Sequence, residues 1–160
     1  MSRIAYHEAS PGALQAMLAL ESYVAKSGLE KPLLELVKMR ASQLNGCAYC
    51  LDMHSKDALA AGETTQRLFV LSAWREAPTL YTDRERAALA WTEAVTQLGP
   101  HGVPDDVYRD ARAQFDERQL VDLTMAVVAI NGWNRLAVGF RQKVGDYQPG
   151  MAARLASAGA

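Results

Sequence analysis

Hydrophobic side chains recur at intervals of three and four residues along most of the chain. In the first such stretch they include Leu14, Met17 and Leu18, and a later stretch repeats the spacing at Leu120, Leu123 and Val127. This spacing places side chains on one face of an α-helix. No segment shows the two-residue alternation that is typical of a half-buried β-strand. The pattern therefore predicts an all-α fold.

Residues that start and stop helices divide this pattern into seven predicted helices. Gly28 ends the first, and Asn45-Gly46 ends the second with a pair suited to the left-handed conformation of a helix C-cap. Thr82-Asp83-Arg84-Glu85 has the form of a capping box, and Asp116 is placed to cap the last helix. The predicted helices span residues 11–26, 31–44, 47–62, 64–74, 82–98, 104–114 and about 116–144.

A chain of 160 residues has the size of one domain. We expect that domain to cover residues 1–144. Residues 145–160, with Pro149, Gly150 and an alanine-rich end, are expected to form a flexible C-terminal tail. Two segments echo each other, Asn45-Gly46-Cys47 and Asn131-Gly132-Trp133, each after a hydrophobic helical stretch. This echo raises the hypothesis of a degenerate internal duplication.

Charge and hydropathy narrow the classes of partner. The formal net charge is -1, and there is no block of lysine and arginine, which argues against binding to nucleic acid or to an anionic membrane. The longest strongly hydrophobic run, residues 123–130, is too short to span a bilayer, and no secretory signal is evident. We therefore expect a cytoplasmic protein whose partners are small molecules or other proteins. In that compartment a close cysteine pair is more often catalytic or metal-binding than structural.

The candidate chemistry lies in eight consecutive residues that hold both cysteines, Cys47 and Cys50, and one of the three histidines, His54. On a helix Cys50 lies about 60° from Cys47, and His54 projects between them, so all three side chains can meet. A helix N-terminus also stabilises the thiolate, which is the reactive form of cysteine. A disulfide between residues three apart on a helix needs a local adjustment. The pattern favours a dithiol redox site.

The same residues allow other interpretations. The cysteines could be small core residues, and with His54 they could bind zinc, although a structural zinc site needs a fourth ligand. Attached c-type haem is excluded in its usual form because Leu51, not histidine, follows Cys50. We expect no metal and no cofactor.

His54 could accept the thiol proton, and a carboxylate would be the usual group to orient it. Glu35 in the preceding helix is the candidate. Its spacing alone, however, favours a surface ion pair with Lys31 or Lys38.

Glu35, eleven intervening residues, Cys47-x-x-Cys50, three further residues and His54 together resemble the AhpD-like alkylhydroperoxidase family, within the carboxymuconolactone decarboxylase superfamily. The resemblance includes residues 35–46, 82–89 and 133–135, and it covers roughly residues 6–144. It implies an all-helical AhpD-like fold that assembles as a homotrimer or homohexamer. It also makes Glu35 an expected active-site residue.

The resemblance implies a thiol-dependent peroxidase acting on alkyl hydroperoxides or hydrogen peroxide. Cys50 would attack the peroxide, Cys47 would resolve the product to a disulfide, and Glu35 with His54 would relay the proton. A thioredoxin-like or lipoyl protein would then reduce the disulfide. The chain departs from the family at Tyr49, where better-characterised members carry histidine. A redox-sensing disulfide switch or a disulfide reductase is therefore the alternative, whereas the superfamily's namesake decarboxylation needs no dithiol.

Overall fold

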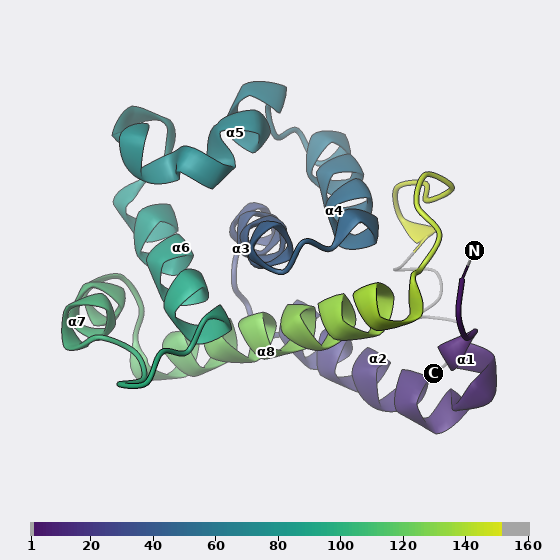
Figure 1. The fold of residues 1–160 in the computed structure, drawn as a ribbon. Helices are drawn as coiled ribbons and strands as arrows, with labels where there is room; N and C mark the ends of the chain where they lie inside the picture. Colours follow the sequence, from purple (N-terminus) through teal and green to yellow (C-terminus); the bar gives the residue numbers. More distant parts are fainter. Residues whose placement is uncertain (1, 152–160) are drawn as a thin grey trace.

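Helix α3 (Lys31–Leu44) lies at the centre of the computed structural model, which describes residues 2–151. It packs against α4 (Ala48–Ala60), α6 (Asp83–Thr96) and α8 (Glu117–Phe140), as Figure 1 shows. Within residues 2–151 there is no β-strand, and the isolated bridge between Gly99 and Gly102 lies in a loop. These observations confirm the all-α prediction.

The remaining helices enclose this centre. Helix α2 (Pro11–Ala25) packs along α8 and follows the short α1 (Tyr6–Ala9), while α7 (Asp105–Gln114) packs on α6. Helix α5 (Thr65–Val70) and the 3-10 turns η1 (Leu71–Glu76) and η2 (Pro78–Leu80) connect α4 to α6. No helix in the described part of the chain is both long and hydrophobic enough to cross a membrane.

The helix ends follow the predicted caps in two places. The side chain of Thr82 accepts the Glu85 N–H, and the Glu85 carboxylate accepts the Thr82 N–H, which is the expected capping box. Asp116 caps α8 through the N–H of Gln119 at 2.7 Å. Each cap satisfies backbone donors that the first turn of a helix leaves unpaired.

Two helices end about one turn before their predicted C-terminal residue. The helix expected over residues 64–74 ends at Val70, and Ala73 leaves helical geometry so that Trp74 reaches Glu93 on α6, with its indole nitrogen 2.8 Å from the carboxylate. The last helix ends at Phe140 instead of about residue 144, because Arg141 adopts a left-handed conformation with φ 53°. Both departures depend on tertiary or backbone features that periodicity does not register.

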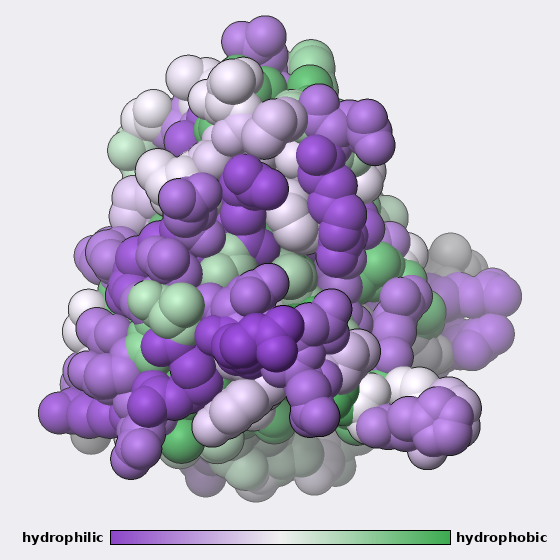
Figure 2. Space-filling view, turned by 90° about the vertical axis from the view of Figure 1, so that its left-hand side faces the viewer, coloured by the Kyte–Doolittle hydropathy of each residue, from purple (hydrophilic) through white to green (hydrophobic). Residues whose placement is uncertain are grey.

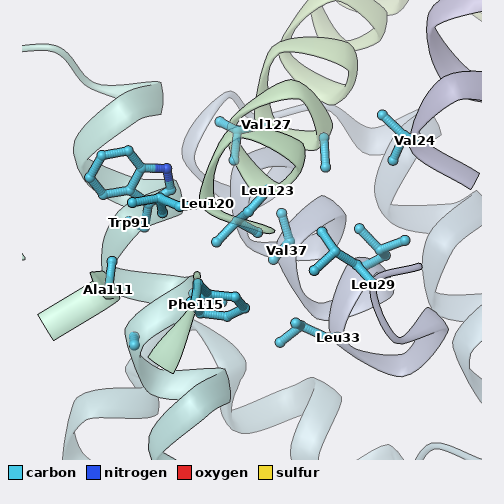
Figure 3. Close-up of a cluster of buried hydrophobic side chains, with 14 of the residues drawn as sticks. Val24, Leu29, Leu33, Val37, Trp91, Ala111, Phe115, Leu120, Leu123 and Val127 are labelled. Atoms are coloured by element: carbon cyan, nitrogen blue, oxygen red, sulfur yellow. The ribbon is translucent and has the colours of Figure 1, made fainter. Parts of the chain in front are cut away.

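The hydrophobic core forms where α2, α3, α6, α7 and α8 meet (Figure 3). Its buried members include Val24, Leu33, Val37, Trp91, Phe115, Leu123 and Val127. A second cluster of buried side chains lies between α3, α4, η1 and α6. Figure 2 shows the face on which α6 and α7 lie, and hydrophilic residues cover most of it. The core thus fixes α3, which carries Glu35, beside α4, which carries Cys50 and His54.

The first part of the predicted tail packs on α4, beside which it lies in Figure 1. Tyr147 is only 5% exposed, and its hydroxyl donates to Asp57 Oδ2 at 2.6 Å. The Gly145 N–H donates to Asp52, and Lys56 Nζ donates to the carbonyls of Gly145 and Tyr147. Residues 145–151 therefore brace the outer side of α4, and residues 152–160 lie outside the described residues.

The two echoing segments have different local structures. Gly46 follows α3 with φ +63°, a conformation that favours glycine, and turns the chain toward α4. Gly132 lies inside α8, where a Cβ atom would come within 2.8 Å of Met17 Cε on α2. One glycine therefore makes a turn and the other permits close helix packing, so local structure adds no support to a duplication.

Candidate active site

The cysteine pair lies at the junction between α3 and α4. Cys47 is extended, with φ -86° and ψ 92°, and occupies the N-cap of α4 instead of its first turn. This is the local adjustment that a disulfide needs: the Cα atoms of Cys47 and Cys50 are 5.4 Å apart, and the two residues form a disulfide. The Cys50 N–H donates to Cys47 Sγ at 3.3 Å. When the bond is reduced, the helix N-terminus would stabilise a thiolate at this position.

His54 lies one helical turn beyond Cys50 on α4 and is 5% exposed. Its Nδ1 atom is 2.9 Å from Oε2 of Glu35, which α3 presents from the neighbouring helix. Burial acts to raise the pKa of Glu35, but the hydrogen bond and charge of His54, followed by the charge of Lys38, lower that pKa overall. An ionised Glu35 accepts a hydrogen bond from Nδ1–H, which leaves Nε2 of His54 as the basic nitrogen.

The lysines that could have paired with Glu35 take other positions. Lys31 is exposed, and the ammonium group of Lys38 forms an ion pair with Glu21 on α2. The other carboxylate oxygen of Glu21 accepts the indole N–H of Trp133 at 3.3 Å. Glu35 is therefore hydrogen-bonded to His54, as the resemblance implies, and not engaged in the surface ion pair that spacing alone favours.

A network of hydrogen-bonded asparagine and serine side chains links the turn before Cys47 to α8. Asn134, 1% exposed on α8, donates to Ser42 Oγ at 3.0 Å and accepts from Asn45 Nδ2 at 2.8 Å. Asn45 also donates to Asn131 at 2.9 Å, and the Ser42 carbonyl accepts the Cys47 N–H at 3.0 Å. Sequence reasoning missed this network. The available signal was the pair of asparagines three residues apart in the otherwise hydrophobic centre of α8.

Both cysteines are almost completely covered. Cys47 is 0% and Cys50 1% exposed, and they pack in a small cluster that Tyr49 and Trp133 help to cover. Burial raises the pKa of the Tyr49 phenol, and the negative charge of Asp52 raises it further. Tyr49 is therefore a neutral hydrogen-bond donor at neutral pH, not a base. Burial, followed by the proximity of Tyr49, also raises the pKa of Tyr6 on α1.

No group of three or more histidine, cysteine, aspartate or glutamate side chains within residues 2–151 is arranged to hold a metal ion. Two shallow hollows lie along α8, with volumes of about 510 and 370 Å³. The larger lies beside the C-terminal end of α6, and the smaller is lined in part by Asn45 and Asn134. Neither is lined by Cys50 or His54. The disulfide itself is covered by packed side chains.

Comparison with known proteins places this arrangement in a family. The sequence profile of the carboxymuconolactone decarboxylase family matches residues 11–94, a span that includes all four candidate residues. The chain belongs to the carboxymuconolactone decarboxylase family. It is also 41% identical over 136 residues to the uncharacterised protein YdfG of Bacillus subtilis, a match that covers 85% of this chain and 92% of YdfG.

Solved structures of similar proteins agree with this assignment to the carboxymuconolactone decarboxylase family. A protein of unknown function from Agrobacterium tumefaciens, for which a role as the antioxidant defence protein AhpD has been suggested, superposes with a TM-score of 0.87 at 47% identity. The match covers 92% of this chain and 100% of that one, and it confirms the AhpD-like fold. The debrominase Bmp8 shares the fold, with a TM-score of 0.76 at 17% identity over 93% of this chain and 77% of Bmp8.

Proposed function

We propose that this member of the carboxymuconolactone decarboxylase family is a thiol-dependent peroxidase. The observation that supports the proposal most is the combination of a Cys47–Cys50 disulfide with His54, one turn away, hydrogen-bonded to Glu35. A cysteine pair that can close, a base beside it and a carboxylate that orients the base are the groups that peroxide reduction by a dithiol requires.

The proposed reaction begins with the reduced protein. Nε2 of His54 takes the proton from the Cys50 thiol, and the thiolate attacks one peroxide oxygen. The O–O bond breaks, Cys50 becomes a sulfenic acid, and the departing alkoxide takes the proton back from His54 to leave as an alcohol. The Cys47 thiol then attacks the Cys50 sulfur and releases water, which forms the disulfide. An external dithiol returns two electrons and two protons.

The side-chain packing around the disulfide supports a small substrate. Because both cysteines are buried in a cluster against which Tyr49 and Trp133 pack, a small hydroperoxide should reach Cys50 more readily than a bulky one. The reductant is proposed to be a thioredoxin-like or lipoyl protein, which reacts through an exposed thiol. The homotrimeric or homohexameric assembly that the resemblance implies belongs to the same proposal.

Peroxide consumption with dithiothreitol as the electron donor tests the proposal. Cys50→Ser should abolish turnover. Cys47→Ser, treated with peroxide in the absence of dithiothreitol, should react once and keep a sulfenic acid that dimedone labels at Cys50. His54→Ala should lower the rate by about 100-fold or more. Ser55→Ala, on the same helix, is the control and should keep the wild-type rate.

The alternative function predicts a different result. If the disulfide cycles with dithiols but no peroxide is consumed, the peroxidase proposal is wrong and a disulfide reductase or redox switch is favoured. Light-scattering masses of the oxidised and reduced protein would then separate the two, because only a switch changes its assembly.

A further inference from the structure

A second ion pair lies behind the Glu35–His54 pair. Lys38, one turn after Glu35 on α3, is 8% exposed, and its partner Glu21 belongs to α2. The indole N–H of Trp133 on α8 holds Glu21 from the other side. A lysine is rarely buried to this degree without a partner, and here the partner comes from a different helix. Side chains from α2, α3 and α8 thus meet around one buried cation, which lies one turn from Glu35 on α3.

The charges alternate in sign along Glu21, Lys38 and Glu35. Burial raises the pKa of Glu35, while His54 and then Lys38 lower it. The positive charge of Lys38 therefore favours the ionised form of the carboxylate. In the reduced protein the Cys50 thiol lies one turn before His54 on α4, and the uncharged indole of Trp133 on α8 contacts Glu21. Lys31, four residues before Glu35, is exposed, and solvent screens its charge.

The Glu35–His54 pair acts as a base only while it lacks one extra proton. A proton on His54 occupies Nε2 directly. If Glu35 is protonated, its O–H donates a hydrogen bond to Nδ1, and the imidazole takes the tautomer that carries hydrogen on Nε2. Either location removes the base, so the coupled titration of the pair decides the outcome. A nearby positive charge opposes this proton uptake, and a nearby negative charge favours it.

We propose that the Glu21–Lys38 ion pair sets the pH below which the Glu35–His54 pair stops acting as a base. Lys38 is then a positioning residue that acts through Glu35, and Glu21 limits its effect. The inference rests on the proposed function because it concerns the same base. It differs from a purely structural role because the two members of the ion pair act in opposite directions.

Four variants of the reduced protein test the inference. The direct readout is the titration of the His54 imidazole by NMR, assigned by its loss in His54→Ala. Lys38→Met should move this titration to higher pH, and Glu21→Gln should move it to lower pH. Lys38→Arg and the matched control Lys31→Met should leave it in place.

The same variants should change the pH profile of peroxide consumption. Relative to its rate at about pH 7.5, Lys38→Met should lose up to about tenfold more activity at about pH 5.5 than the wild type. Shifts of the same sign in Lys38→Met and Glu21→Gln, or no shift in folded Glu21→Gln, would overturn the inference. If Lys38→Met does not fold, Glu21→Gln alone decides. The NMR titration needs no turnover, so a failure of the peroxidase proposal is distinguishable from a failure of this one.

Discussion

Replacing Asn134 by alanine removes the residue at the centre of the amide network below the cysteine turn. The wild-type side chain donates to Ser42 and accepts from Asn45, at 3.0 and 2.8 Å. Asn45 keeps a second acceptor in Asn131, but the Ser42 side chain, 0% exposed, loses the donor that reaches it from α8.

The expected loss of stability follows from this inventory. Two hydrogen bonds contribute about 1 kcal/mol each, and a buried polar group left without its partner adds about 1–2 kcal/mol. We therefore expect Asn134→Ala to lower the free energy of unfolding by about 3–4 kcal/mol. The exposed Val128 on the same helix provides a control, because Val128→Ala should change stability by about 0.5 kcal/mol.

Urea unfolding followed by circular dichroism measures this difference in the oxidised and the reduced protein. The network also reaches the cysteine turn, because the Ser42 carbonyl accepts the Cys47 N–H. Reduction of the disulfide by dithiothreitol should therefore be faster in Asn134→Ala. A loss of unfolding free energy below about 1 kcal/mol would refute the stability argument. An unchanged reduction rate would show that the network stabilises helix packing without affecting the disulfide.

Three further changes test other parts of the structure. Because the pKa of Glu35 is lowered in the folded state, its ionised form stabilises the protein above pH 4.5, and this contribution is lost as pH falls through the lowered value. Glu35→Gln should therefore make the free energy of unfolding fall less steeply as pH falls. A pH dependence equal to that of the wild type would contradict this. Tyr147→Phe removes the hydrogen bond to Asp57 and should lower the free energy of unfolding by about 1–2 kcal/mol. It should also speed amide hydrogen exchange in α4, and unchanged exchange would show that residues 145–151 do not stabilise that helix. Leu123→Ala, at a fully buried site, should lower the free energy of unfolding by about 3 kcal/mol, measured by thermal unfolding, compared with about 0.5 kcal/mol for Val121→Ala at an exposed site. Equal losses would show that Leu123 does not belong to the hydrophobic core.

The sequence predicted those features that depend on neighbours along the chain. Helical periodicity identified α3 and its end at Asn45-Gly46, and the capping box at Thr82 was visible as a four-residue pattern. The meeting of Cys47 and Cys50 also follows from a short spacing. In each case the physical cause lies within one or two helical turns.

Features that depend on distant segments were not accessible in the same way. The contact between Glu35 and His54 came only from resemblance, because spacing along α3 favoured a lysine partner. The bond from Asn45 to Asn134 joins residues 89 positions apart, and no local pattern indicates such a pair. The buried position of Lys38 likewise depends on Glu21, which a different helix supplies.

The central place of α3 has a consequence for protein engineering. One side of this helix supplies buried core residues such as Leu33 and Val37, and the same fourteen-residue segment carries Glu35, Lys38 and Ser42. Substitutions selected there for thermostability will therefore also alter the candidate site. Helix α7 contributes only Ala111 as a buried residue and lies away from α4 (Figure 1). It is the element on which labels, surface charges or attachment points can be varied independently of the chemistry.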